Sequence, residues 1–115
     1  MLKIIIFIYT LMLPFTSLSH TAIEFLSPEN GSILSEPPED ITIIFVYSAM
    51  FTKFEMLKTD SNDEKIELKK DFLQKSSDTH LVSLPVLERG EYRVEWRALA
   101  QDGHVIKGKF AFKIN

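Results

Sequence analysis

Near its C-terminus the chain alternates between apolar and polar residues over two successive segments. The segment 91–97 places Tyr92, Val94 and Trp96 on one face and charged residues on the other. The last segment repeats the pattern, with Ile106, Phe110, Phe112 and Ile114 facing inward and lysines facing outward. A period of two residues is typical of a β-strand with one buried face. Because the 3.6-residue period of a helix is absent after residue 19, the pattern predicts an all-β protein.

Shorter apolar segments, separated by turn residues, predict further strands. We expect them at 22–26, 41–47, 54–57, 65–68 and 80–84, and we expect the charged segment 69–78 to be irregular. Asn30-Gly31 is a strong turn signal, and Pro37-Pro38 cannot continue a ladder of backbone hydrogen bonds. About seven short strands without a long helix predict an antiparallel β-sandwich.

Two single positions carry local predictions. Gly108 falls on the inward side of the last strand, and the gap it leaves could be filled by Trp96. His80 follows a polar run at the start of a strand, and we interpret it as a solvated residue at the sheet edge.

The first 19 residues have the three parts of a secretory signal. Lys3 supplies the positive region, residues 4–15 are almost entirely apolar, and Ser17 and Ser19 are the small residues before the cleavage point. The apolar run is shorter than the roughly 20 residues that a membrane-spanning helix needs. We therefore expect residues 1–19 to be removed and residues 20–115 to form one domain.

Charge and cysteine content exclude several classes of function. The chain of 115 residues has a formal charge of −3, and the part after Lys3 carries −4 because that lysine belongs to the leader. A mildly acidic domain is not expected to bind nucleic acid. The absence of cysteine excludes disulfides, thiolate metal sites and cysteine nucleophiles.

Cleavage after Ser19 would make His20 the first residue of the mature protein. A histidine in that position offers a free amine and an imidazole to the same metal ion. Asp102-Gly103-His104 offers a second imidazole with a carboxylate two residues before it. Nitrogen and oxygen donors of this kind suit copper(II). Asp-Gly is also a common hairpin turn, and the two interpretations are compatible because a sharp turn could aim Asp102 and His104 in the same direction.

The mature chain resembles the CopC family of periplasmic copper-resistance proteins. The resemblance rests on His20-Thr21-Ala22, Ser27-Pro28, Asn30-Gly31, the Gly90, Tyr92, Val94, Trp96, Arg97 strand, Asp102-Gly103-His104 and Gly108. It implies an immunoglobulin-like, Greek-key β-sandwich and a periplasmic protein that carries or buffers Cu(II). It also implies that His20, Asp102 and His104 are the ligands, and that an inner-membrane copper transporter or another periplasmic copper protein receives the ion. We expect a monomer without enzymatic activity.

Two departures from the family pattern narrow this prediction. Many relatives carry a glutamate after the apolar strand, where this chain has Phe45-Val46-Tyr47 and no carboxylate. Some relatives carry a methionine-rich stretch for copper(I), whereas the mature part of this chain has only Met50 and Met56. The resemblance therefore implies copper(II) alone. Arg97 is expected to bond either Asp102 or a neighbouring glutamate.

Three alternatives remain open from the sequence. The first is a metal-free binding module, since one fold serves many functions. The second is a copper-dependent oxidative enzyme, because polysaccharide-oxidising monooxygenases also use an N-terminal histidine, although so short a chain leaves little room for a substrate face. The third is zinc, which accepts the same ligands in tetrahedral geometry.

Overall fold

A computed structural model describes residues 22–115, which form seven strands and no helix. The strands are β1 (Ile23–Ser27), β2 (Ser32–Leu34), β3 (Asp40–Lys58), β4 (Glu64–Ile66), β5 (Ser76–Ser83), β6 (Gly90–Ala100) and β7 (Val105–Ile114). Within this part of the chain there is no helix long and apolar enough to cross a membrane. The predicted leader 1–19 and His20 lie outside the described residues.

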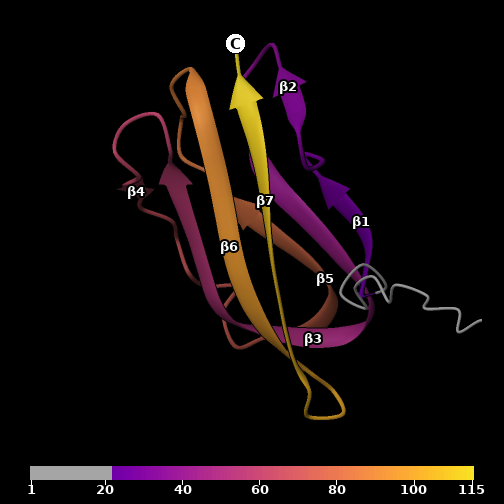
Figure 1. Cartoon of the computed structure of the whole chain (residues 1–115). Coiled ribbons are helices and arrows are strands. Elements are labelled where there is room, and N and C mark those ends of the chain that lie inside the picture. The colour runs from indigo at the N-terminus through magenta and orange to yellow at the C-terminus, as the bar shows by residue number, and fades with distance from the viewer. Residues whose placement is uncertain (1–21) are drawn as a thin grey trace, which may run out of the picture.

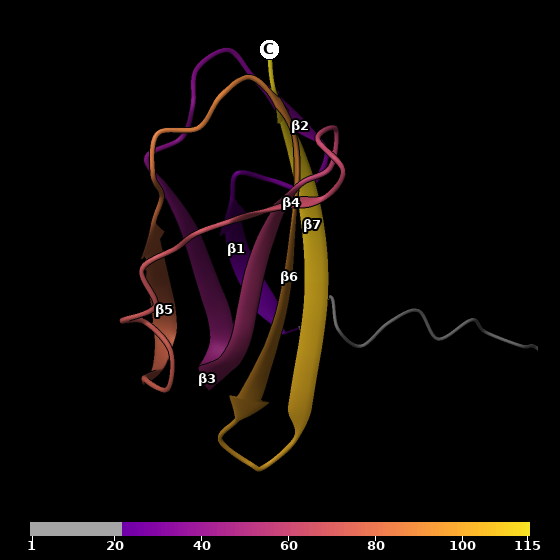
Figure 2. The same ribbon diagram turned by 90° about the vertical axis from the view of Figure 1, so that its left-hand side faces the viewer.

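The long strand β3 belongs to both layers of the sandwich. Its first half pairs with β1 and β5, and its second half pairs with β6 and β4. Its pairing with β5 shifts register between Ile44 and Ala49, where β3 turns from one layer into the other. Figure 1 shows this bend, and the side view in Figure 2 shows β5 on one side of the molecule and β7 on the other. The β-sandwich predicted from the sequence is therefore confirmed.

Strand boundaries differ from the prediction at β3, β2 and β5. Strand β5 begins at Ser76, within the segment 69–78 that was expected to be irregular. The segments 41–47 and 54–57 were expected to be separate strands, but they are the two halves of β3. The short strand β2 was not predicted, and it pairs in parallel with β7 while the other pairs are antiparallel. The chain enters this pair through the Asn30-Gly31 turn, where Gly31 has a φ of +84° and its N–H donates to the carbonyl of Ala111 at 2.7 Å.

The core between the layers is largely aromatic. Phe45, Phe51, Phe54, Phe72, Tyr92, Trp96, Phe110 and Phe112 are all buried, together with aliphatic residues of β3, β5, β6 and β7. The predicted inward faces of β6 and β7 are confirmed, apart from Ile106, which is half-buried. Tyr92 also ties the loop before β6 to the core, since its hydroxyl donates to the carbonyl of Glu88 at 2.6 Å. Such a bond to backbone a few residues upstream is typical of the tyrosine corner of Greek-key sandwiches.

The prediction that Trp96 fills the space beside Gly108 is confirmed. The two residues are directly opposite each other on β6 and β7. A Cβ atom built on Gly108 would lie 2.6 Å from Cζ2 of Trp96, so no larger residue fits without displacement of the indole.

The prediction for His80 is wrong. His80 is only 4% exposed, and its ring lies against Phe45 and Phe51. Its Nε2 is 3.0 Å from the carbonyl oxygen of Ala49 and 2.8 Å from that of Ser77. Because both partners only accept hydrogen bonds, Nε2 carries the proton. The imidazole thus lies inside the molecule beside the bend of β3, where it bonds the Ala49 carbonyl.

Candidate metal centre

The loop 101–104 connects β6 to β7 and carries the two predicted ligands that the structure describes. Two backbone bonds close it: the Ala100 N–H donates to His104 O at 2.8 Å, and the Gly103 N–H donates to Ala100 O at 3.0 Å. Gly103 has a φ of +92°, a conformation that residues with a side chain rarely adopt. No atom lies within 4 Å of a Cβ built there, so the backbone angle alone requires glycine.

Asp102 and His104 contact each other through two hydrogen bonds. The His104 N–H donates to Oδ1 of Asp102 at 3.1 Å, and Nδ1 of the ring lies 2.7 Å from Oδ2. Since an ionised carboxylate only accepts, Nδ1 carries the proton in this pair. In the neutral ring the second nitrogen, Nε2, then has a free lone pair, and it makes no hydrogen bond to any of residues 22–115.

Electrostatics favour the charged form of Asp102. The backbone N–H of His104 and, next, its ring hold the pKa of the Asp102 carboxyl below its usual value. Both side chains remain largely open to solvent, with exposed fractions of 65% for Asp102 and 79% for His104. The pair is thus a preformed carboxylate–imidazole unit that a solute can reach.

A hollow of about 450 Å³ lies beside this pair. Its lining combines the loop with the bend of β3 and the residue before β1: Ala22, Phe45, Tyr47, Ala100, Asp102, His104, Val105 and Ile106. The Val46 N–H donates to Ala22 O at 2.9 Å, which fixes the beginning of the described chain against β3. Apart from the Tyr47 hydroxyl, the side chains in the hollow other than Asp102 and His104 are apolar.

Residues 22–115 contain no group of three histidine, aspartate or glutamate side chains placed to hold a metal ion. Asp102 and His104 supply two donor side chains, so a complete site needs a donor from elsewhere. The third predicted ligand, His20, lies outside the described residues and precedes Ala22 by two positions. The structure thus brings two of the predicted residues together and places the chain leading to the third at the same hollow.

Two residues near the loop, Arg97 and Tyr47, differ from what the sequence suggested. Neither expected bond of the Arg97 side chain, to Asp102 or to a glutamate, is present among residues 22–115, and Arg97 is exposed on the outer face of β6. Tyr47, which is 76% exposed, lines the hollow. It belongs to the stretch Phe45-Val46-Tyr47, in which this chain has no carboxylate. The bend of β3 brings Tyr47 to this hollow, and the pairing of β1 with β3 brings Ala22 there, which the spacing of residues along the chain does not reveal.

Comparison with known proteins agrees with the family resemblance found in the sequence. The family model described as the CopC domain matches residues 23–115. Copper transport protein CutJ of Bacillus subtilis (strain 168) is 30% identical in an alignment of 115 positions, which covers 96% of this chain and 21% of CutJ. The chain therefore spans about a fifth of the length of that curated relative.

Solved structures share the fold. CopC from Methylosinus trichosporium OB3b matches with a TM-score of 0.60 and 21% identity, over 81% of this chain and 91% of that one. PcoC, a methionine-rich copper resistance protein from Escherichia coli, matches with a TM-score of 0.63 and 23% identity, over 81% and 96%.

Proposed function

The chain belongs to the CopC family, and on that premise we propose that it binds copper(II) through His20, Asp102 and His104. The protein would carry or buffer the ion in the periplasm after removal of residues 1–19. The observation that supports this proposal most is the shared hollow, which is lined by Ala22 as well as by Asp102 and His104.

Chain connectivity makes the third ligand reachable. Two residues span at most about 7 Å, so His20 cannot be far from Ala22, which itself lines the hollow. With residues 1–19 removed, the His20 amine and ring can both serve one ion. The hollow, whose only other polar side chain is Tyr47, would shield that ion from water on the side of β3.

The donor set suits copper(II) better than the other common divalent ions. Copper(II) prefers a tetragonal arrangement of nitrogen and oxygen donors, and it binds such sites more tightly than the other first-row divalent metals. His20 would give two nitrogens and His104 a third. Asp102 can provide the fourth donor or hold the His104 ring by Nδ1, an arrangement common among metal-bound histidines. Protons compete for the nitrogens, so binding should weaken below neutral pH.

The names of relatives support a role in copper handling. CutJ is called a copper transport protein and PcoC a copper resistance protein. We propose a carrier rather than an enzyme, and either an inner-membrane copper transporter or another periplasmic copper protein as the partner that exchanges the ion. The chain covers 21% of CutJ, so transport across a membrane is not part of this proposal.

The proposal is tested by copper(II) titration of the mature protein and of His104→Ala. Loss of a direct ligand should weaken binding by more than about 100-fold, since even outer partners of metal ligands contribute 10–100-fold. Gln101→Ala is the matched control, because Gln101 is exposed in the same loop and has no assigned role. Equal affinities of the His104 variant and the control would refute the proposed site.

A further inference from the structure

A row of positive side chains crosses the outer face of three neighbouring strands. Lys53 of β3 is paired with Arg97 of β6, and Arg97 is paired with Lys107 of β7. Adjacent strands lie about 4.8 Å apart, so the row brings three exposed cations together over about 10 Å. Lys109 extends it along β7. We call these four residues the basic row.

The basic row is unfavourable for the fold. Like charges directly opposite each other destabilise a strand pair, and this row contains two such pairs. The nearby carboxylates are already engaged: Glu95 bonds Arg93 at 2.7 Å, and Glu55 bonds Lys65 at 3.2 Å. Within residues 22–115, Arg97, Lys107 and Lys109 form no ion pair, and Lys53 has only a 3.7 Å contact with Glu55.

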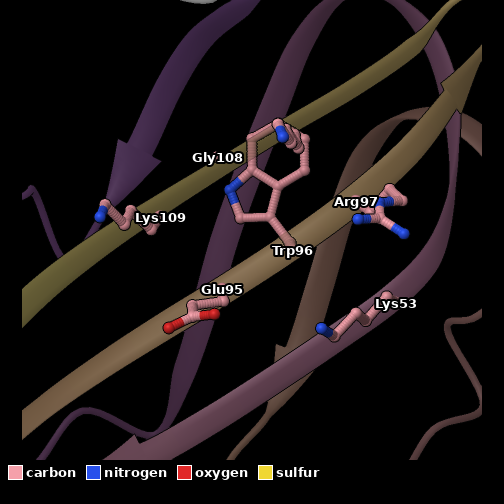
Figure 3. A pocket seen from close by; sticks show the side chains of 7 residues that line it. Lys53, Glu95, Trp96, Arg97, Gly108 and Lys109 are labelled. Atoms are coloured by element: carbon pink, nitrogen blue, oxygen red, sulfur yellow. The ribbon is translucent and has the colours of Figure 1, made fainter.

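The basic row surrounds a hollow of about 430 Å³. Figure 3 shows the lining residues on three neighbouring strands, with the Trp96 side chain lying across Gly108. Because Trp96 packs into the core, it and Gly108 offer mainly backbone to the outer face, and the long charged side chains form the walls. The hollow can therefore admit an anionic group between the cations.

The local charge is opposite to that of the rest of the domain. The hollow is lined by four cations and one carboxylate, Glu95. The remaining described residues contain eight lysines and arginines against fifteen aspartates and glutamates. A positive surface on an acidic domain, kept at a cost in stability, indicates a binding role.

We propose that the basic row is a docking surface for an acidic segment of another protein. Separate carboxylates of a peptide can enter between the cations and avoid Glu95. A continuous anionic lipid surface would instead also contact Glu95 and Glu55, whose negative charges would repel it.

The pair Arg97–Lys107 is three residues from Ala100 and His104 on the same hairpin, a distance of about 10 Å along the strands. If the proposed copper function holds, a docked partner would lie next to the copper loop, but docking itself does not depend on copper.

The test measures binding of fluorescein-labelled hexaglutamate to the metal-free protein, with hexaglutamine as the uncharged probe. At about 0.1 M ionic strength, where charges act over roughly 10 Å, hexaglutamate should bind and hexaglutamine should not. Lys107→Glu should weaken hexaglutamate binding about tenfold, because it reverses the charge at one end of the three-cation row. Lys113→Glu makes the same change in net charge on the same face of β7, opposite Glu91 and outside the row. It should weaken binding less than about twofold.

The proposal would be overturned by equal weakening by both variants, by no binding of hexaglutamate, or by tighter binding of the protein to phosphatidylglycerol vesicles than to hexaglutamate. The last result would assign the surface to a membrane. Thermal unfolding provides the control for folding. Lys107→Glu places opposite charges at the Arg97 pair, so its unfolding midpoint should equal or exceed that of the parent protein. Lys107→Gln, which only removes the charge, should give an intermediate affinity, and parental affinity of this variant would also count against docking.

Discussion

The contact between Gly108 and Trp96 allows a quantitative prediction for Gly108→Ala. The new Cβ would lie 2.6 Å from Cζ2 and 2.8 Å from Cε2 of the indole. Carbon atoms in good contact are about 3.5–4.0 Å apart, so the ring must move by about 1 Å. It has little freedom to do so, since its centroid lies 5.5 Å from that of Phe45 and 5.7 Å from that of Phe51.

Overpacking of this kind costs about 1–3 kcal/mol, and the lower chain entropy of alanine offsets about 0.5–1 kcal/mol. We expect a net loss of about 1–2 kcal/mol. For a domain of this size each kcal/mol corresponds to about 4–8 °C in Tm, so Tm should fall by roughly 5–15 °C.

The assay is thermal and urea unfolding followed by circular dichroism, repeated in a Trp96→Phe background. The smaller ring leaves room for the added methyl group, so the two substitutions should be less than additive by about 1 kcal/mol. Gly103→Ala is the control: it is also destabilising, through its φ of +92°, but it has no steric neighbour and should be additive with Trp96→Phe. Full additivity of Gly108→Ala with Trp96→Phe would refute the packing argument.

Three further predictions concern buried polar groups. Tyr92→Phe should lower the free energy of unfolding by about 1 kcal/mol, because the bond to the Glu88 carbonyl is lost; urea unfolding measures this, and an unchanged value would contradict it. Burial raises the pKa of the Tyr92 phenol, so the folded state keeps this proton longer than the unfolded state. Stability should therefore fall as the pH rises above the ordinary phenol pKa of about 10, and less steeply in Tyr92→Phe. His80→Ala should cost about 2–4 kcal/mol, since it creates a cavity and removes the hydrogen bond that His80 makes to the carbonyls of Ala49 and Ser77. A loss below about 0.5 kcal/mol, as expected for a surface residue, would be inconsistent with its burial.

Strands β6 and β7 could be predicted from the sequence because each has one buried and one solvated face, which produces a clear period of two. Strand β3 could not be predicted as a single strand. Its partners change along its length, and its register shifts between Ile44 and Ala49 and again between Phe51 and Lys53. A bend of this kind depends on which strands lie on either side, and the local sequence carries no signal for it.

The same bend explains the error at His80. A polar run before a strand usually indicates an exposed start, and residues Ser76, Asp78 and Thr79 are indeed exposed. His80 instead points into the core, where a carbonyl at the bend, Ala49 O, accepts a hydrogen bond from its Nε2. Only the three-dimensional path of β3 creates that acceptor.

The candidate site was partly visible in the sequence. Asp102 and His104 are two residues apart around a glycine, so a tight turn was enough to predict that they meet. Their mutual hydrogen bonds, which leave Nε2 of the ring free, could not be predicted from spacing. The hollow also depends on Tyr47, which the bend of β3 brings to the loop, and on Ala22, which the pairing of β1 with β3 holds beside it.

The central claim is that the amine and ring of His20 complete the copper site with Asp102 and His104. Its most direct test is the copper(II) affinity of protein that begins at His20, compared with protein carrying one additional alanine before His20. The extension converts the amine into an amide and leaves all side chains unchanged. We predict that the extended protein binds at least about 100-fold more weakly, as expected for the loss of one ligand. Equal affinity of the two proteins would show that the amine is not a ligand and would contradict the account.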